Sequence, residues 1–218
     1  MTNLVSPPDI YQGQFGTFTI TERDRREVIF YRAGLGLAGL TFAIGSGLIL
    51  WQGTNLDILS ALTLLFALFS LGLGISLALI HIYLVLLHRV LQAFWVIGTL
   101  SSVILAIYSP EPFALFVYQH PLSLFGVGFT FAALTGIYFK EAFCFNRFET
   151  KLLTPLVPLL LLGHLFSILP ASVEQGLLAV WAILFLIFIG RKATQEIPPD
   201  IGDKSVFTYL KQQKVSNP

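Results

Sequence analysis

Two histidines in the apolar part of this sequence are the side chains best suited to bind a metal. His81 and His164 lie in long uncharged segments, where a neutral imidazole can ligate the iron of a haem or the magnesium of a chlorophyll. His88 follows His81 by seven residues, so on one continuous helix the two would share a face, about 10 Å apart along the axis. A haem held by two histidines needs a facing partner, and His164 is the deep candidate, whereas a chlorophyll needs one ligand. We predict His81 and His164 as cofactor-binding residues, with chlorophyll or carotenoid as the cofactor class; alternatively, each histidine is hydrogen-bonded to a neighbouring helix.

The segment 137–152, IYFKEAFCFNRFETKL, concentrates charge in a chain that is otherwise apolar. It contains Cys144, the one cysteine of the chain, and a thiol becomes a nucleophile when a nearby base or cation activates it. No histidine lies in the segment to act as that base, so we interpret it as a loop between two membrane spans rather than a catalytic site. Its charges would orient those spans. The orientation residues are Lys140, Glu141, Arg147 and Lys151.

The composition is that of a membrane protein. Hydrophobic residues make up 55% and charged residues 11% of the 218 residues, and the mean hydropathy is +0.78, whereas soluble domains carry about 25% charged residues. A helix of about 20 apolar residues crosses a bilayer, and six stretches are long enough. They lie at about 33–51, 58–87, 90–108, 121–139, 152–169 and 176–190. We therefore predict an all-α fold, a polytopic membrane helix bundle with six transmembrane helices.

The second and fifth of these spans are irregular. The thirty residues at 58–87 would measure about 45 Å as a helix, so we expect this span to tilt, to project from the bilayer, or to bend near Gly72 and Gly74. The fifth span contains Pro155 and Pro158. A proline inside a helix removes a hydrogen bond, so we expect the fifth helix to begin near Pro158.

The positive charges divide the chain between the two sides of the membrane. With six spans, all thirteen Lys and Arg residues fall on one side, and positive charge marks the cytoplasmic face. We predict that both termini lie on the cytoplasmic side, or on the stromal side of a thylakoid. Residues 1–27 then form a polar N-terminal arm, 28–190 the membrane domain and 191–218 a C-terminal tail. The net charge of +1 argues against a nucleic-acid partner.

Small residues recur every four positions in three of the spans, a spacing that lets membrane helices approach closely. The run GLGLAG at 34–39 resembles a dinucleotide fingerprint, but it lies inside a span and lacks the strand that such a site needs. We predict tight contacts among the first, second and fourth spans, or with another membrane protein. The helix-packing residues are Gly39, Ala43, Gly47, Ser70, Gly74, Ala78, Gly128, Ala132 and Gly136.

Two of the small-residue stretches are similar to each other. GLTFAIGSG at 39–47 and GFTFAALTG at 128–136 share five of nine residues. A three-span unit used twice would be inverted, as in many transporters, and would predict a polar cavity near the midplane lined by the first and fourth spans. No Asp, Glu or Lys lies deep in a predicted span, which argues against ion-coupled transport.

Two charged and aromatic stretches resemble a known family. ITERDRREVIFYR at 20–32 and LTGIYFKEAFCF at 134–145 are similar to a family of uncharacterised multi-pass integral membrane proteins of cyanobacteria and plastids. The resemblance implies a thylakoid or other photosynthetic membrane, and partners among photosynthetic complexes, such as a photosystem or its assembly intermediate. It implies no activity and no residue roles.

The sequence favours a role other than catalysis. It contains no metalloprotease motif, no phosphate-binding loop and no nucleophile with a motif-linked histidine. We expect a non-enzymatic membrane scaffold or assembly factor, embedded in a thylakoid or cytoplasmic bilayer and associated with a larger membrane complex, which holds a pigment in one form of this hypothesis. The alternative is a small-solute transporter or channel built from the inverted repeat.

Overall fold

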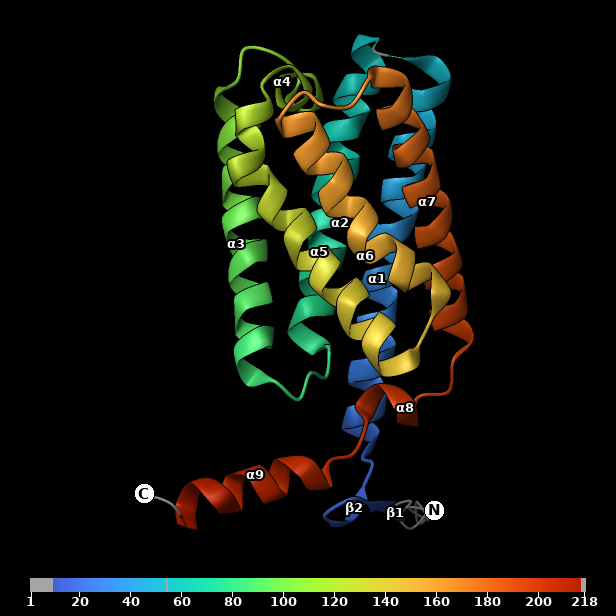
Figure 1. Ribbon diagram of the computed structural model, residues 1–218, viewed down its shortest axis with the longest axis vertical. Helices are drawn as coiled ribbons and strands as arrows, with labels where there is room; N and C mark the ends of the chain where they lie inside the picture. The colour runs from blue at the N-terminus through green and yellow to red at the C-terminus, as the bar shows by residue number, and fades with distance from the viewer. Residues whose placement is uncertain (1–9, 54, 217–218) are drawn as a thin grey trace, which may run out of the picture.

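Six long helices dominate the computed structural model, which describes residues 10–53 and 55–216 (Figure 1). They are α1 (Glu22–Gln52), α2 (Leu56–Leu79), α3 (Val85–Tyr108), α5 (Leu124–Phe145), α6 (Phe148–Leu165) and α7 (Ala171–Thr194). Each is long and apolar enough to cross a membrane. The prediction of an all-α, six-span membrane bundle is confirmed.

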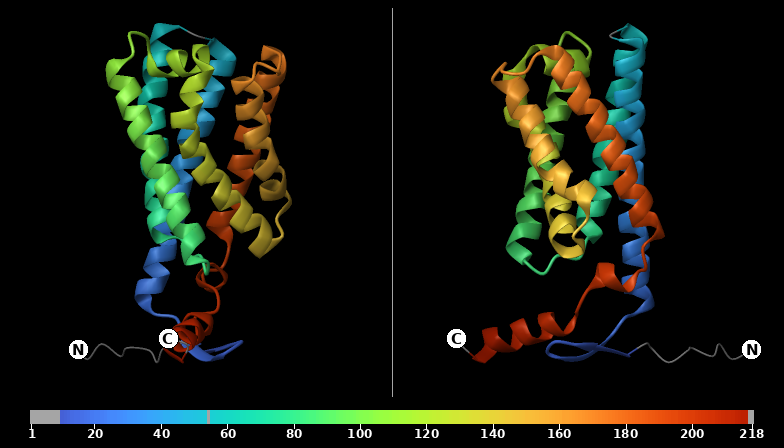
Figure 2. Two further views of the ribbon diagram at one scale, coloured as in Figure 1. Left: turned by 60° about the vertical axis from the view of Figure 1, so that its left-hand side comes forward. Right: turned by 45° about the vertical axis from the view of Figure 1, so that its right-hand side comes forward.

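The long helices form a closed ring in chain order. Each packs against the next, from α1 through α2, α3, α5 and α6 to α7, and α7 returns to α1 (Figures 1 and 2). Several large aromatic side chains are buried inside the ring, among them Tyr138 from α5 and Trp181, Phe185 and Phe188 from α7. The indole N–H of Trp181 donates to the Tyr138 hydroxyl at 3.2 Å. The middle of the bundle is therefore packed with aromatic rings.

Two short helices close one end of the bundle, here called the α4 end. They are α4 (Phe113–Gln119) and the 3-10 helix η1 (Pro121–Ser123), which together connect α3 to α5. The helix α4 has seven residues and is too short to cross a membrane.

The other end, here called the charged end, carries both arms of the chain. Before α1, β1 (Ile10–Gly13) and β2 (Gly16–Thr19) form an antiparallel hairpin. After α7, α8 (Pro198–Ile201) lies beside α1, and α9 (Ser205–Ser216) lies beside β2. Both arms leave the bundle at the same end, as an even number of spans requires.

The first helix begins earlier than predicted. The Thr21 hydroxyl accepts from the backbone N–H of Asp24 at 3.2 Å, and the Asp24 carboxylate accepts from the backbone N–H of Thr21 at 2.7 Å. This capping box starts α1 at Glu22, so residues 22–27, assigned to the polar arm, are its first turns. The correction has a simple reason: hydropathy measures the apolar part of a helix and misses polar turns that continue into water.

The long second span is broken where no bend was predicted. The span expected over 58–87 ends as α2 at Leu79, and α3 begins at Val85 instead of near residue 90. The Leu77 carbonyl, left free at the end of α2, accepts hydrogen bonds from His88 Nε2 at 2.6 Å and from Gln92 Nε2 at 3.1 Å. Because side chains of α3 satisfy the end of α2, the break needs neither glycine nor proline.

The fifth span runs through both of its prolines. It begins at Phe148, not near Pro158, and Pro155 and Pro158 lie inside α6. Each proline leaves one carbonyl of the preceding turn without its helical donor. Membrane helices tolerate this because adjacent helices and nearby hydroxyls stabilise the backbone, and α6 packs against both α5 and α7.

The predicted contact between the first and second spans is confirmed at a pair of glycines. A Cβ atom added to Gly34 would lie 2.6 Å from the carbonyl oxygen of Gly72, and one added to Gly72 would lie 2.6 Å from that of Gly34. Neither glycine belongs to the predicted ridges, but each lies on the same helix as one of them.

Some of the predicted ridge residues face other helices than expected. Gly74 of α2 and Gly136 of α5 both face α3, at Trp95 and Leu91 respectively, and Gly39 of α1 faces α7. The fourth span, α5, packs most extensively against the third and the fifth. It contacts the first span at Glu141 and Tyr31 and the second at Phe131 and Phe69, so the predicted contacts with these spans are present, between larger side chains.

The remaining ridge residues divide between packed and open positions. Ser70 is buried and its hydroxyl lies 2.8 Å from that of Thr99 on α3. Gly47 and Ala78 are exposed, and Gly128 contacts only its own helix. The last two ridge residues, Ala43 and Ala132, are half-buried in the bundle. The four-residue spacing of small side chains alone does not show which neighbouring helix a ridge contacts.

Candidate functional site

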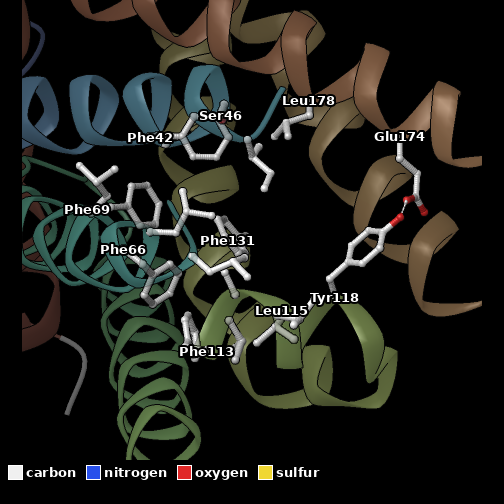
Figure 3. A pocket seen from close by; sticks show the side chains of 18 of the residues that line it. Phe42, Ser46, Phe66, Phe69, Phe113, Leu115, Tyr118, Phe131, Glu174 and Leu178 are labelled. Carbon is white, nitrogen blue, oxygen red and sulfur yellow. Dashed lines mark hydrogen bonds between the residues drawn. The ribbon is translucent and has the colours of Figure 1, made fainter. Parts of the chain in front are cut away.

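A cavity of about 620 Å³ lies inside the ring at the α4 end (Figure 3). Side chains of α1, α2, α4, α5, α6 and α7 line it. Its wall is mainly apolar, and it includes five phenylalanine side chains, Phe42, Phe66, Phe69, Phe113 and Phe131. The bundle therefore contains a partly open, mainly apolar cavity between its membrane spans.

The cavity ends at the aromatic centre of the bundle. The Trp181 ring lies 4.5 Å from that of Phe42 and 5.4 Å from that of Phe131, between centroids. These rings separate the cavity from the charged end. The transporter hypothesis predicted a polar cavity near the midplane lined by the first and fourth spans. The corresponding helices, α1 and α5, do line this cavity, but its wall is mainly apolar.

One cluster of polar side chains lies at the edge of this cavity. His164 Nδ1 is 2.8 Å from Glu174 Oε1, and His164 Nε2 is 3.0 Å from the backbone carbonyl oxygen of Tyr118. The Tyr118 hydroxyl donates to Glu174 Oε2 at 3.2 Å, and its ring stacks on the imidazole at 4.8 Å. Residues from α4, α6 and α7 thus meet at one point (Figure 3 shows the Tyr118–Glu174 pair).

The hydrogen bonds define where the protons of this cluster lie. A carbonyl oxygen can only accept, so His164 Nε2 carries a hydrogen and donates it to Tyr118. One further proton lies between His164 Nδ1 and Glu174 Oε1, giving either an imidazolium with a carboxylate or a neutral histidine with a carboxylic acid. Both ring nitrogens of His164 are therefore engaged by protein atoms.

The two predicted ligand histidines lie at opposite ends of the bundle. His164 is at the α4 end, whereas His81 lies in the 80–84 linker at the charged end, outside the second span to which it was assigned. The prediction that they hold one haem is wrong, because the bundle separates them. His88 belongs to α3, so it does not share a helix with His81. Chlorophyll ligation by a single histidine stays a prediction.

His81 has an acidic environment of its own. Its Nε2 lies 3.7 Å from Glu27 Oε2, and ligand atoms of Asp24, Glu27 and His81 all lie within 4.8 Å of one another. Burial lowers the pKa of His81 from its ordinary value of 6.5, and Glu27 opposes this change. Lys204 donates to Asp24 and Arg23 to Glu27, each at 2.8 Å, so both carboxylates already have a cationic partner.

A second polar cluster lies at the charged end, centred on Glu141. This carboxylate is fully buried and accepts from Lys140 Nζ at 3.0 Å, from Lys192 Nζ at 2.7 Å and from the Tyr31 hydroxyl at 3.2 Å. Residues of α1, α5 and α7 therefore meet at one buried negative charge.

Asp200 connects the C-terminal tail to this cluster. Arg32 donates to Asp200 Oδ2 from Nε at 2.8 Å and from Nη2 at 2.7 Å, and Lys192 also donates to Asp200. Arg32 further donates to the backbone carbonyls of Gln195 and Glu196. The turn after α7 and the short α8 are thus fixed to α1.

Arg147 and Glu149 extend the cluster to α6. Arg191 donates to Glu149 at 2.8 Å, and Arg147 donates to the side chain of Gln195. Three cations, Lys140, Arg147 and Lys192, lie within 5.6 Å of the Phe145 ring centroid. All members together are Tyr31, Arg32, Lys140, Glu141, Arg147, Glu149, Arg191, Lys192, Gln195 and Asp200, here called the ion cluster.

The predicted orientation loop is mostly not a loop. Lys140 and Glu141 lie in α5, and the helices α5 and α6 are separated by Asn146 and Arg147 alone. Lys140, Glu141 and Arg147 are buried in the ion cluster, and Lys151 is exposed on α6. The loop assignment is wrong because the helices extend beyond the apolar segments; a role of these charges in orienting the spans stays a prediction. Cys144 is exposed, as expected.

Sequence reasoning missed the partners of these residues. None of these partners was predicted as a site residue: Tyr118 and Glu174 at the α4 end, and Tyr31, Lys192 and Asp200 at the charged end. A usable signal existed for the ion cluster: its acidic and basic members all lie just outside the apolar segments on one predicted side. The sequence contains a weaker signal for Glu174, because the predicted spans place it at the same end of the bundle as His164 and indicate nothing more specific.

Comparison with protein families adds an assignment. The family model described as "Uncharacterized integral membrane protein (DUF2301)" matches residues 75–209. The chain belongs to the DUF2301 family. It is therefore an integral, multi-pass membrane protein, in agreement with its six apolar helices. No curated protein matches the chain, and no solved structure matches it.

The DUF2301 match includes most of both polar clusters. It contains Tyr118, His164 and Glu174 at the α4 end, and Glu141 and Asp200 at the charged end. The helix α1, which supplies Tyr31, Arg32 and Phe42, precedes it. The ion cluster is thus built from the matched segment together with the first helix, and the cavity also uses α2 residues such as Phe66 and Phe69, which precede the match.

Proposed function

We propose that this DUF2301 protein is a non-enzymatic membrane scaffold that holds one amphipathic, lipid-like molecule in the cavity at the α4 end. The supporting observation is the apolar cavity of about 620 Å³ with a single polar cluster at its edge. Sites for small ligands usually measure roughly 300–1,000 Å³ and combine apolar walls with few polar groups. A ligand of this class would come from the surrounding bilayer.

The lining of the cavity indicates which chemistry the ligand should have. An uncharged, mainly hydrocarbon body would contact the phenylalanine side chains, whose rings favour flat or unsaturated groups. A polar head group would lie near Tyr118, Glu174 and Gln175, which line the same cavity. Because His164 and Glu174 are hydrogen-bonded to each other, the cluster is suited to orient a head group.

A narrower form of the proposal concerns pigments and photosynthesis. The resemblance to proteins of cyanobacteria and plastids favours chlorophyll or carotenoid as the ligand, and a photosystem or its assembly intermediate as the partner complex. It also favours a thylakoid or cytoplasmic membrane, with both termini on the cytoplasmic or stromal side. The location of thirteen Lys and Arg residues on one predicted side supports that orientation.

Lipid extraction of matched variants tests the proposal. The protein is purified from its native membrane in mild detergent, and bound molecules are identified by native mass spectrometry and visible absorption. Ala114→Phe places a ring in the cavity, and Ala106→Phe places the same ring on the exposed face of α3. A stoichiometric lipid-like ligand lost only in Ala114→Phe is expected. Equal ligand content in both variants would refute the cavity as the site, and a colourless ligand would refute the pigment form.

A second candidate, a small-solute transporter, has one supporting observation. The contacts among α1, α2 and α3 recur among α5, α6 and α7, and the α3–α5 contact corresponds to the α7–α1 contact. This order suits two inverted halves. The test uses a Ser46→Cys variant in a Cys144→Ser background, labelled with a membrane-impermeant maleimide in vesicles of both orientations. Labelling from both sides would favour transport, and labelling from one side would favour the scaffold.

A further inference from the structure

The helix α4 is attached to the bundle in two different ways at its two ends. At its first residue, Phe113 is buried and its ring lies 5.0 Å from that of Phe66 on α2. The helix also packs against α3 and η1. Near its last residue, Tyr118 reaches across to α6 and α7 through the polar contacts with His164 and Glu174. One end of α4 is thus held by packing and the other by hydrogen bonds.

The same helix covers the cavity. The side chains of α4 that line it are Phe113, Ala114, Leu115, Val117 and Tyr118. In Figure 1, α4 lies across the end of the ring of long helices. Pro112 precedes the helix and Pro121 follows it, so both connections are turns rather than continuations of α3 or α5. The cavity is partly open with α4 in this position, and moving the Tyr118 end away from α6 and α7 would widen its opening while the Phe113 end stays packed.

We propose that α4 is the lid of the cavity and that the His164–Glu174–Tyr118 cluster is the latch that holds it closed. A lipid-like ligand would then reach the cavity when Tyr118 separates from His164 and Glu174. This inference rests on the proposed ligand-binding function and adds a means of controlling access to the same cavity.

The geometry makes His164 the central member of the latch. It contacts α4 through the Tyr118 carbonyl and ring and α7 through Glu174, so its removal breaks these contacts and leaves the Tyr118–Glu174 hydrogen bond as the remaining part of the latch. Removing the Tyr118 hydroxyl breaks one hydrogen bond and leaves the stacked ring and the carbonyl contact in place. The two variants should therefore open the lid to different degrees, His164→Ala more than Tyr118→Phe.

Cysteine accessibility measures the lid directly. Cys144 is exposed and is the one cysteine of the chain, so Cys144→Ser gives a background in which Ser46→Cys reports on the cavity. The rate of labelling by a membrane-impermeant maleimide is compared in this background with His164→Ala, Tyr118→Phe and a control. The control is His120→Ala, because His120 is exposed, stacks on Phe116 and bonds to its carbonyl.

The expected result is a graded increase in the labelling rate. His164→Ala should raise it about tenfold, Tyr118→Phe two- to threefold, and His120→Ala should leave it within about twofold. Unchanged rates in His164→Ala and Tyr118→Phe would overturn the latch. So would an equal increase in His120→Ala, since loosening α4 itself would then explain the effect. If His164→Ala does not fold, the labelling rates of Tyr118→Phe and His120→Ala are compared instead.

The experiments test the proposed lid and the proposed bound ligand separately. Labelling reports on the lid whether or not a molecule is bound, whereas extraction of the wild-type protein reports on the ligand. A bound lipid with unchanged labelling rates in both latch variants would overturn the latch and leave the proposed function standing. Faster labelling in the latch variants without any bound lipid would support a lid and overturn the ligand.

Discussion

The two ends of the bundle stabilise polar groups inside a membrane protein in different ways. At the charged end, Glu141, Lys192 and Asp200 are almost completely buried and each bonds to several partners from different helices. At the α4 end, His164 and Glu174 are only partly buried and bond mainly to each other and to Tyr118. Next to the first cluster the helices are tightly packed, and next to the second lies the large cavity.

This difference indicates which end is fixed and which can move. Separating the helices of the charged end would leave unpaired charges in a medium of low dielectric, which is very unfavourable. Moving Tyr118 away from α6 and α7 at the α4 end requires the loss of two hydrogen bonds and one ring stacking, between side chains that are only partly buried. We infer that the ion cluster holds the bundle together while the α4 end adapts to a ligand.

The largest expected effect is that of Glu141→Ala. This change leaves Lys140 and Lys192 buried without their shared carboxylate, and removing one partner of a buried ion pair costs about 3–5 kcal/mol. We expect a large fall in the thermal unfolding temperature in detergent, followed by tryptophan fluorescence. The same change at the α4 end, Glu174→Ala, should have a clearly smaller effect. Equal effects of the two variants would contradict the comparison of the two ends.

A double variant at Glu141 and Lys192 distinguishes the loss of the ion pair from the loss of side-chain packing. When both partners of a buried ion pair are replaced by apolar side chains of similar size, the cost is often small. Glu141→Leu with Lys192→Met should therefore unfold at a higher temperature than Glu141→Ala alone. A double variant as unstable as the single one would show that Glu141 acts through more than its charge.

Asp200 should control how firmly the C-terminal tail is attached. Asp200→Asn keeps the shape of the side chain but weakens its bonds to Arg32 and Lys192, which fix α8 to the bundle. We expect trypsin to cleave after Lys204 about tenfold faster, as a loss of about 1.4 kcal/mol would give. Mass spectrometry of the fragments measures the rate. Glu196→Gln, an exposed neighbour, is the control, and a similar increase there would argue against a specific role for Asp200.

Two glycines of α1 test whether the two ends of the bundle differ in how tightly their helices pack. Gly34, next to the ion cluster, leaves no room for a Cβ against α2, whereas Gly47, towards the α4 end, has nothing within 4 Å. We expect Gly34→Ala to destabilise the protein by about 1–3 kcal/mol, as overpacking does. Gly47→Ala should be neutral or slightly stabilising, because alanine favours a helix over glycine. Thermal unfolding of both variants tests this, and two equal shifts would contradict it.

The number of spans was predictable because apolar length is a local property. Residues 33–51 and the five other stretches are long enough to cross a bilayer whatever surrounds them. The ends of the helices were less predictable. The break after Leu79 depends on His88 and Gln92, which lie on the next helix, and α6 continues through Pro158 because its neighbours support it.

The candidate sites were predictable only as single residues. His164 was identified as a deep histidine, but its partners depend on how α4 and α7 meet, which no local pattern encodes. Phenylalanine lines the cavity and also lies on the exposed surface of the bundle. The sequence alone therefore does not distinguish Phe66, which lines the cavity, from Phe125, which is exposed. The charges of Lys140 and Glu141 were recognised, yet their burial follows from Lys192 near the end of α7 and from Asp200 in the C-terminal arm.

The smallest expected effect concerns His81, at the edge of the charged end. Its pKa is lowered below 6.5, chiefly by burial, so the folded protein binds its proton less readily than the unfolded chain does. The stability that this gives is fully present above pH 6.5 and is lost as the pH falls through the lowered pKa. Because the side chain is partly exposed, we expect a contribution of about 0.5 kcal/mol or less.

A His81→Asn variant isolates this contribution. Between pH 7.5 and about 5.5, the wild-type protein should lose slightly more stability than His81→Asn, and the two should be equally sensitive to pH above 7. Thermal unfolding at a series of pH values measures the difference. A larger loss in the variant would mean that the Glu27–His81 pair, at 3.7 Å, tightens on protonation and outweighs burial. In that case acid would strengthen the attachment of the 80–84 linker to α1, and the charged end would respond to pH in the direction opposite to the one predicted.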